Sequence, residues 1–308
     1  MLVRFDRKDV KMNTVSFPLL DLSFDINRVA FSIGNLKVYW YGIIIAVGFM
    51  LAVLYGYKRA NKFGIVPDKV ADVAIFGIIG GVIGARLYYV IFSWERFKDD
   101  FWGIFEIWEG GIAVYGGLIG GVIAGAIVCK VSKIKFTAML DLAVIGFLIG
   151  QGIGRWGNFV NVEAYGAPMQ TNLPWGMTSA KIVSELGVET GTLVHPCFLY
   201  ESLWCLLGVL VLHLYSKHRR FDGELALFYC VWYGAERFVV EGLRTDSLYI
   251  GEFRVSQMLA IVFCIGAAIA WITIRVMIHK KGNPEYLLPL GKTAKKDTIE
   301  ETDNGEDN

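Results

Sequence analysis

One stretch of the sequence gathers residue types that bind a phosphate. It is Gly154–Asn161, which reads GRWGNFVN, and Glu163 and Gly166 follow it closely. The guanidinium of Arg155 offers a planar fork of donors that suits a phosphodiester, and the glycines allow backbone to approach a headgroup closely. These residues indicate a phosphate site, and an arginine that snorkels beside tryptophan at a membrane interface is the alternative interpretation of Arg155.

A second group of polar residues has the spacing of one helical face. Tyr233, Arg237, Glu241 and Arg244 stand at offsets of four, eight and eleven residues. Arg237 and Glu241 can therefore form an ion pair one turn apart. Because charge is costly to bury in lipid, this pair favours a functional site. A structural ion pair that ties helices together is the alternative.

Several other chemistries are excluded by the sequence. The four histidines and five cysteines are dispersed without the spacing of metal ligands, so we expect no metal and no cofactor. His195 before Pro196 fits a headgroup contact or a helix start equally well. Gly150–Gly154 has glycines like those of a dinucleotide loop but no preceding strand. A net charge of +1 predicts no binding of nucleic acid.

The elements that must hold these residues are membrane helices. The chain is 55% hydrophobic and only 19% charged, whereas soluble domains carry about 25% charge. We predict an all-α, polytopic membrane protein with about seven transmembrane helices, since the apolar runs reach the roughly 20 residues that span a bilayer. The expected ranges are 38–57, 70–92, 112–130, 137–154, 196–215, 225–242 and 255–278. The sixth is the weakest, because Glu236 and Arg237 interrupt it.

Lysine and arginine concentrate in alternate loops between these segments. The positive-inside rule makes those loops cytoplasmic, so we expect the N-terminus outside and the C-terminus in the cytoplasm. The basic first eleven residues conflict with this orientation, and a true start at Met12 would remove the conflict. We expect an extracytoplasmic segment at 1–37, a catalytic membrane domain at 38–280 that includes an extracytoplasmic loop at 155–195, and a disordered cytoplasmic tail at 281–308.

Polar residues from several predicted helices then fall at one depth, in the outer half of the membrane. A channel distributes such groups along its pore, and a transporter places its site near the midplane. A shallow polar cavity favours chemistry on a lipid headgroup. A lipid or small-molecule transporter is the main alternative, and a lipid-binding scaffold is a third. The convergent residues are Tyr41, Arg86, Tyr115, Arg155, Asn158, His195, Tyr200, Glu201, Arg237, Glu241 and Arg244.

The order of these motifs resembles the prolipoprotein diacylglyceryl transferase family over about residues 30–280. The matching strings are YWYG at 39–42, GARLYYV at 84–90, IWEGG at 107–111, GGLIG at 116–120, GRWGNFVN at 154–161, HP and FLYE within 195–201, and RFVVEGLR at 237–244. The resemblance implies a multi-pass enzyme of the bacterial plasma membrane. It would transfer the diacylglyceryl group of phosphatidylglycerol to the lipobox cysteine thiol of a preprolipoprotein and release glycerol phosphate.

The resemblance also implies roles for individual residues. Arg155 would bind the headgroup, and Asn158, Glu163 and Gly166 would shape its site. The expected catalytic residues are Arg155, Arg237, Tyr115, Tyr41 and Glu241. The expected phosphatidylglycerol-binding residues are Arg155, Asn158, Glu163, Gly166, Tyr233, Arg244, Arg86, His195 and Glu201.

Tyr115 is a departure from the family pattern, since many members carry histidine between the GG strings where this chain has tyrosine. Histidine accepts a proton near neutral pH, whereas tyrosine, with a reference pKa of about 10, is a poor base. Either Tyr115 positions a substrate by hydrogen bonding, or nearby arginines promote the thiolate without a dedicated base. In both cases Arg155 and Arg237 must lie together to stabilise the leaving phosphate.

Overall fold

The structure is a computed structural model that describes residues 14–34, 36–98, 100–245, 249–250, 253–284 and 287–289. The question of a start at Met12 and most of the predicted tail therefore lie outside the described residues. The chain divides into two compact units, which we describe separately. The first contains Met1–Ala52, Val144–His218 and Ala226–Lys280, and the second contains Val53–Ala143, Arg219–Leu225 and Lys281–Asn308.

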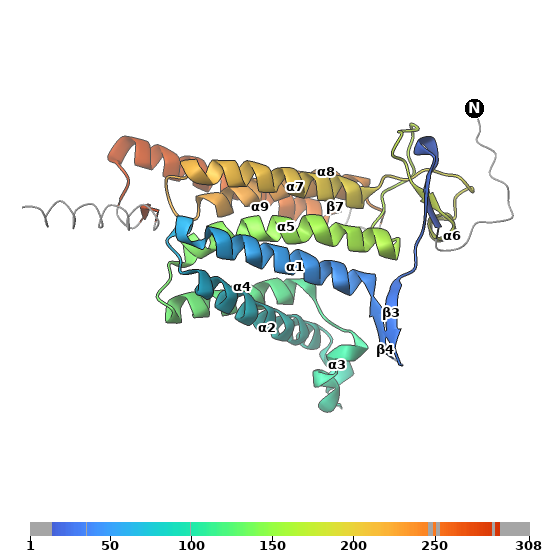
Figure 1. The fold of residues 1–308 in the computed structure, drawn as a ribbon, viewed down its shortest axis with the longest axis horizontal. Coiled ribbons are helices and arrows are strands. Elements are labelled where there is room, and N and C mark those ends of the chain that lie inside the picture. The colour runs from blue at the N-terminus through green and yellow to red at the C-terminus, as the bar shows by residue number, and fades with distance from the viewer. Residues whose placement is uncertain are drawn as a thin grey trace, which may run out of the picture. The chain divides into compact units, whose positions relative to one another are not determined.

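The first unit is built on long helices that pack through small residues. An added Cβ at Gly152 of α5 would lie 3.3 Å from Cys205 Cβ of α7, and one at Gly208 would lie 2.5 Å from Trp232 Nε1 of α8. The absence of side chains at these glycines thus lets α7 approach α5 and α8 closely. Figure 1 shows these helices running along one another. The helices are α1 (Trp40–Arg59), α5 (Phe136–Asn161), α7 (Cys197–Tyr215), α8 (Glu224–Leu243) and α9 (Val255–Lys281). The end of α1, the start of α5 and the first residues of α8 belong to the second unit.

Short strands beside the helices were not expected from an all-α sequence pattern. β1 (Thr14–Phe17) pairs antiparallel with β2 (Leu22–Asp25) and β5 (Thr178–Ser179). Val15 and Phe17 are buried while Thr14 and Ser16 are half-exposed, and this alternation spans only four residues, too few to stand out in the sequence. The unit also contains the hairpin of β3 (Val29–Ile33) and β4 (Leu36–Tyr39), the helix α6 (Ala180–Leu186), and the hairpin of β6 (Tyr249–Ile250) and β7 (Phe253–Arg254).

The small sheet has an apolar core of its own, which joins it to the end of α5. Strand residues pack with the chain that follows α5 and with the start of α7. The buried members are Val15, Phe17, Val162, Tyr165, Met177, Ile182, Val194 and Phe198. This core fixes the segment between Asn161 and the start of α7 against α5.

The second unit is dominated by one close helix pair, α2 (Pro67–Phe92) and α4 (Val114–Val131). Gly80 and Gly84 of α2 face Gly116 and Gly120 of α4, and a Cβ added at Gly84 would overlap the carbonyl oxygen of Gly116. The glycine-rich strings GIIGGVIGA at 77–85 and GLIGGVIAG at 117–125 thus contribute to opposing packing faces. Short helices follow α2 and precede α4: α3 (Trp94–Phe97), η3 (Trp102–Phe105) and η4 (Ile107–Glu109).

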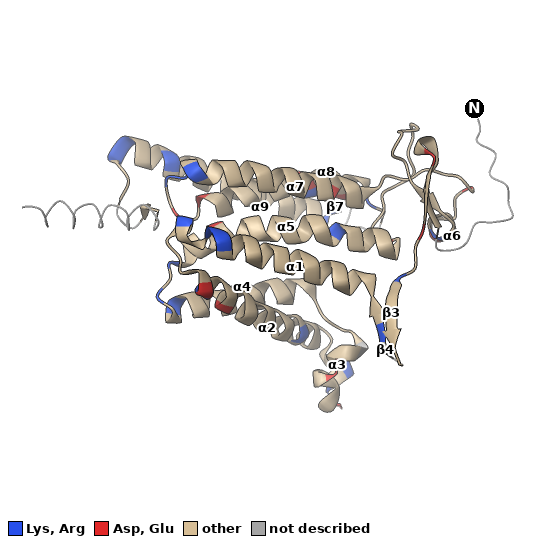
Figure 2. Ribbon diagram, viewed as in Figure 1, with Lys and Arg blue, Asp and Glu red and all other residues tan. Residues whose placement is uncertain are grey.

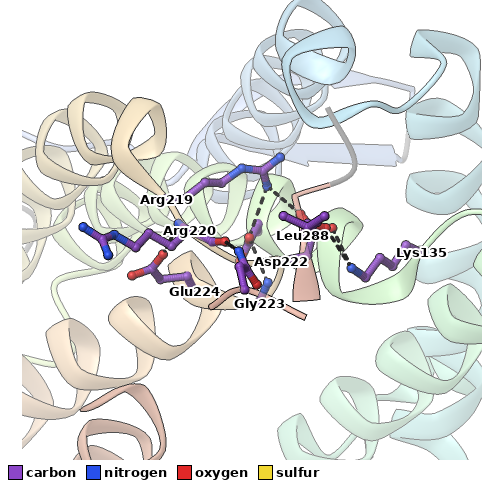
Figure 3. A network of polar contacts seen from close by, with 9 residues as sticks. Lys135, Arg219, Arg220, Asp222, Gly223, Glu224 and Leu288 are labelled. Carbon is purple, nitrogen blue, oxygen red and sulfur yellow. Dashed lines mark hydrogen bonds and ion pairs between the residues drawn. The ribbon is translucent and has the colours of Figure 1, made fainter. Parts of the chain in front are cut away.

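A buried polar network closes one end of the second unit, where α5 begins (Figure 3). Arg219 Nη1 lies 3.2 Å from both Asp141 Oδ2 and Asp222 Oδ1, and Lys135 Nζ lies 3.1 Å from Asp222 Oδ2. The backbone N–H of Gly223 donates to Asp141 Oδ2 over 2.9 Å. The network ties the loop between α7 and α8 to the first turns of α5, and its mutual pairing offsets the cost of burying charge.

Six described helices are long and apolar enough to cross a membrane, so the chain is a polytopic membrane protein. Charged residues gather mostly toward the helix ends, and the helix middles are largely uncharged (Figure 2). α8 does not meet the same length and composition criterion. It contains Glu236, Arg237 and Glu241, the charges that weakened the sequence prediction for this segment.

Candidate active site

An ion-pair cluster of the first unit brings together residues from α5, α7 and α8. Arg155 Nε lies 2.6 Å from Glu201 Oε2, and Arg237 Nη1 lies 3.4 Å from Glu201 Oε1. Arg237 Nη2 also lies 2.6 Å from Glu241 Oε2, one helical turn away. Two arginines that are far apart in the sequence therefore share one carboxylate, and the requirement that Arg155 and Arg237 lie together is met.

Burial in this cluster is uneven in a way that suits ligand binding. The side chains of Glu201 and Glu241 are 1% and 2% exposed, whereas those of Arg155 and Arg237 are each 21% exposed. The carboxylates are thus buried supports, whereas the two arginine side chains remain partly exposed. Such support fixes the direction of the remaining N–H donors before any ligand arrives.

Glu201 has a more central position in the site than its sequence pattern indicated. From the sequence it was expected among the lipid-binding residues, and in the structure its carboxylate pairs with both arginines. Its neighbour Ser202 donates to the Gly152 carbonyl over 2.8 Å and accepts from Trp156 Nε1 over 3.1 Å. These bonds hold the start of α7 against α5 and so help to place the Glu201 carboxylate.

Tyr233 lies on α8 one turn before Arg237, as the spacing predicted. Its ring stacks on that of Tyr229 with centroids 5.7 Å apart, and Gln151 Nε2 of α5 donates to Tyr229 Oη over 2.9 Å. The tyrosine pair therefore contacts α5 one helical turn before Arg155.

Gly166, His195 and Arg244 come together at the ends of α7 and α8. Gly166 N–H donates to the His195 carbonyl over 2.8 Å, and Gly166 and Arg244 form an isolated β-bridge. An added Cβ at Gly166 would lie 2.7 Å from His195 Cβ and 2.9 Å from Cys197 Sγ. Close packing is thus a sufficient reason for glycine here. His195 Nδ1 lies 3.2 Å from Tyr200 Oη, and burial lowers the pKa of its imidazole.

The end of α5 carries the remaining predicted residues of the first unit. Glu163 Oε1 accepts from Asn158 Nδ2 over 3.0 Å and from Asn161 Nδ2 over 3.2 Å. Val162 and Ala164, on either side of Glu163, have φ angles of 50° and 53°. Left-handed backbone is unfavourable for a β-branched residue. The chain here holds strain that aims the Glu163 side chain back at α5.

A cavity of about 530 Å³ opens beside this strained segment. Tyr41 reaches it from the first turn of α1, where Gly157 leaves space for its ring, since a Cβ there would lie 2.5 Å from Tyr41 Cδ2. The lining residues are Arg28, Val38, Tyr39, Tyr41, Gly42, Asn161, Glu163 and Lys181. Arg28 and Lys181 were missed by the sequence analysis, because each is a single cation in a segment without a recognisable pattern.

Arg86 and Tyr115 belong to the second unit and are described within it. Arg86 is 8% exposed, and its guanidinium donates over 2.6–2.8 Å to the carbonyls of Gly103, Ile104, Gly110 and Gly111. These bonds anchor the segment that leads into α4. Tyr115, 54% exposed, stands in the first turn of that helix. The lipid-binding role of Arg86 and the catalytic role of Tyr115 stay predictions.

Known proteins are similar to this chain over most of its length. The model of the family described as prolipoprotein diacylglyceryl transferase matches residues 28–273. A phosphatidylglycerol–prolipoprotein diacylglyceryl transferase of Clostridioides difficile is 41% identical over 80% of this chain and 95% of its own length. Proteins of the same name from Finegoldia magna and Listeria innocua are 41% and 40% identical, over 83% and 88% of this chain and 98% and 97% of their own. This chain belongs to the prolipoprotein diacylglyceryl transferase family.

Proposed function

We propose that this protein transfers the diacylglyceryl group of phosphatidylglycerol to the lipobox cysteine thiol of preprolipoproteins, with release of glycerol phosphate. The names of its relatives support the reaction and both substrates. The observation that carries the proposal is the pairing of Arg155 and Arg237 on the buried carboxylate of Glu201. This cluster supplies what the chemistry needs, a fixed set of cationic donors within a helical membrane protein.

The arginine cluster suits the phosphate of the lipid. Because Glu201 and Glu241 hold each guanidinium from the buried side, the remaining N–H groups are available to phosphate oxygens on the accessible side. The same donors stabilise the charge that grows on the leaving group, and they do so without reorganising. Asn158, Tyr233 and Tyr41 would border the same lipid and its reacting carbon, and Glu163 would shape this site by holding Asn158.

The reaction is a displacement at carbon. The cysteine sulfur attacks the diacylglycerol carbon that bears the phosphate ester, the C–S bond forms and the C–O bond breaks. The bonding electrons leave with glycerol phosphate, which the arginines stabilise. The thiol proton goes to solvent or to the leaving phosphate. Tyr115 positions the substrate by hydrogen bonding in this scheme.

We also propose that α8 is a seventh membrane helix, with the N-terminus outside and the C-terminus in the cytoplasm of the bacterial cell. Arg237 pairs with Glu201 and Glu241, and Glu236 is only 5% exposed, so α8 need not expose these charges to lipid. The basic residues in alternate loops support the orientation.

The test is a reconstituted assay with two products. Purified protein is mixed with a lipobox peptide and vesicles of phosphatidylglycerol, and thioether and glycerol phosphate are both measured. We expect equimolar products that require peptide and lipid together. Glycerol phosphate release without peptide, or lipid binding without either product, would contradict the proposed reaction.

A further inference from the structure

The cavity at the end of α5 is larger than a lipid phosphate requires, and charged side chains stand on its wall. Its volume is about 530 Å³, and its lining brings two cations and one carboxylate together with two tyrosines. Pockets of about 300–1,000 Å³ take ligands of many atoms. The cavity thus has room for several amino-acid residues, and its mixed charge suits a ligand with both donors and acceptors, such as a peptide main chain.

The carboxylate of Glu163 is prepared as an acceptor. Both amide donors that hold it, from Asn158 and Asn161, bond to Oε1. Among the described residues no hydrogen bond reaches Oε2, and Glu163 lines the cavity. The strained backbone on both sides, with Val162 and Ala164 at positive φ, keeps the carboxylate in this place. Oε2 is therefore available to an N–H donor in the cavity.

The two cations are held on the same wall. Arg28 Nη2 donates to the Asn161 carbonyl over 2.8 Å, and Lys181 Nζ donates to the carbonyls of Asn161 and Val162 over 3.0 and 2.7 Å. These bonds cap the C-terminal end of α5 and fix both side chains. A guanidinium has five N–H donors and an ammonium has three. Arg28 therefore retains donors for a carbonyl oxygen of a ligand, whereas Lys181, whose ammonium also lies 3.6 Å from Glu185 Oε1, attracts such an oxygen through its charge.

The cavity lining also includes part of a β-strand. Val38 and Tyr39 of β4 line the cavity. β4 pairs with β3 on one side, and within the described part of the chain no strand pairs with its other side. An extended peptide that lies in the cavity can add to such an edge by main-chain hydrogen bonds.

The distance from the arginine cluster sets the register of such a peptide. Asn158 stands three residues after Arg155 on the same face of α5, and Asn161 stands six residues after it. Six helical residues rise about 9 Å, a length that about three extended residues cover. A polypeptide whose cysteine sulfur reacts beside Arg155 would therefore need about three or more extended residues to reach the cavity.

We propose that this cavity is a subsite for the segment of the substrate polypeptide that follows the acceptor cysteine. The segment is held extended, with its main-chain N–H groups on Glu163 and its carbonyls on Arg28 and Lys181. This assignment rests on the proposed function. Because main-chain groups carry the contacts, the subsite tolerates different side chains in the segment. The glycerol part of the lipid headgroup is the competing occupant, and the experiment separates the two.

The experiment varies the peptide first and the protein second. Three lipobox peptides are compared with phosphatidylglycerol vesicles: one that ends as an amide at the cysteine, one extended by four residues, and the extended peptide with N-methyl groups on the second to fourth added residues. We expect the extended peptide to have a KM about tenfold below the truncated one. N-methylation should remove that advantage, whereas changing the side chains should not.

Variants then connect the effect to the cavity. Lys181→Met and Arg28→Met should raise KM for the extended peptide toward that of the truncated one and leave KM for the lipid unchanged. Lys181→Arg should restore part of the advantage, since it keeps the charge and donors. Lys37→Met, on the same hairpin but outside the cavity lining, is the matched control and should behave as the original protein.

The outcomes separate the subsite from the reaction. If the original protein treats truncated and extended peptides alike while making thioether from both, the subsite is refuted and the transferase stands. A rise of KM for phosphatidylglycerol instead of peptide in the Lys181 and Arg28 variants assigns the cavity to the headgroup and also refutes the subsite. Failure to form thioether from any peptide refutes the transferase itself.

Discussion

At the scale of single residues, the carboxylate of Glu201 explains how two arginines can share a small buried space. Repulsion between the guanidinium groups is offset because each pairs with a different oxygen of the same carboxylate. Glu241 holds Arg237 from a second side. Removing one partner of a buried pair leaves an uncompensated charge, at a cost of about 3–5 kcal/mol. Conservative substitutions are therefore the informative ones.

We expect Arg155→Lys to lower kcat/KM for thioether formation by about 10²-fold, and Arg155→Ala to lower it further. Lysine keeps the charge but loses the planar fork that pairs with two oxygens at once, and removing a preorganised donor to a charged transition state costs about 10²–10³-fold. The assay with lipobox peptide and phosphatidylglycerol vesicles measures this kcat/KM. Arg96→Lys, in the second unit, is the control, and full activity of both Arg155 variants would show that Arg155 does not bind phosphate.

Tyr115 tests whether a hydroxyl or a base is needed at the first turn of α4. We expect Tyr115→Phe to lower the rate of thioether formation about tenfold, the effect of losing one hydrogen bond to a substrate. Tyr115→His should retain activity and shift the pH–rate profile toward neutral pH, since imidazole titrates there. A fully active Tyr115→Phe would exclude the hydroxyl from the mechanism.

At the scale of elements, close helix packing depends on individual glycines. We expect Gly84→Ala to lower the free energy of unfolding by about 1–3 kcal/mol, and with it the melting temperature of the purified protein. The reason is that the added Cβ would overlap the Gly116 carbonyl of α4. Gly77→Ala is the matched control on the same helix, since a Cβ there would lie 4.0 Å from the nearest described atom, the Gly121 carbonyl oxygen. Equal melting temperatures for the two variants would contradict the proposed packing.

Helices and motif residues could be predicted from the sequence because their signals are local. The apolar runs matched the long helices, and the spacing of Tyr233, Arg237 and Glu241 placed them on one face of α8. The partnership of Arg155 with Glu201 could not be predicted, since it joins residues 46 positions apart on different helices. The small sheet was missed for a related reason, since its strands are short and β1 and β5 lie far apart in the sequence.

At the scale of the whole molecule, the predicted orientation can be tested by cysteine labelling. Single cysteines replace exposed loop residues in a background without native cysteines. In intact bacteria we expect a membrane-impermeant maleimide to modify Lys98→Cys and Glu189→Cys, and to modify Lys133→Cys only after lysis. Modification of Lys133→Cys alone in unlysed cells would indicate the opposite orientation. Modification of all three cysteines at equal rates would show that the reagent had entered the cells.

The sharing of Glu201 also limits how the molecule can move during turnover. Glu201 belongs to α7, and its two partners belong to α5 and α8. Separating α5 or α8 from α7 would break an ion pair of the buried Glu201 carboxylate, and losing both arginines would leave that carboxylate buried without a counter-charge. We therefore expect these three helices to move together during turnover. The passage through which a two-tailed lipid enters and a lipidated protein leaves would then open elsewhere than between them.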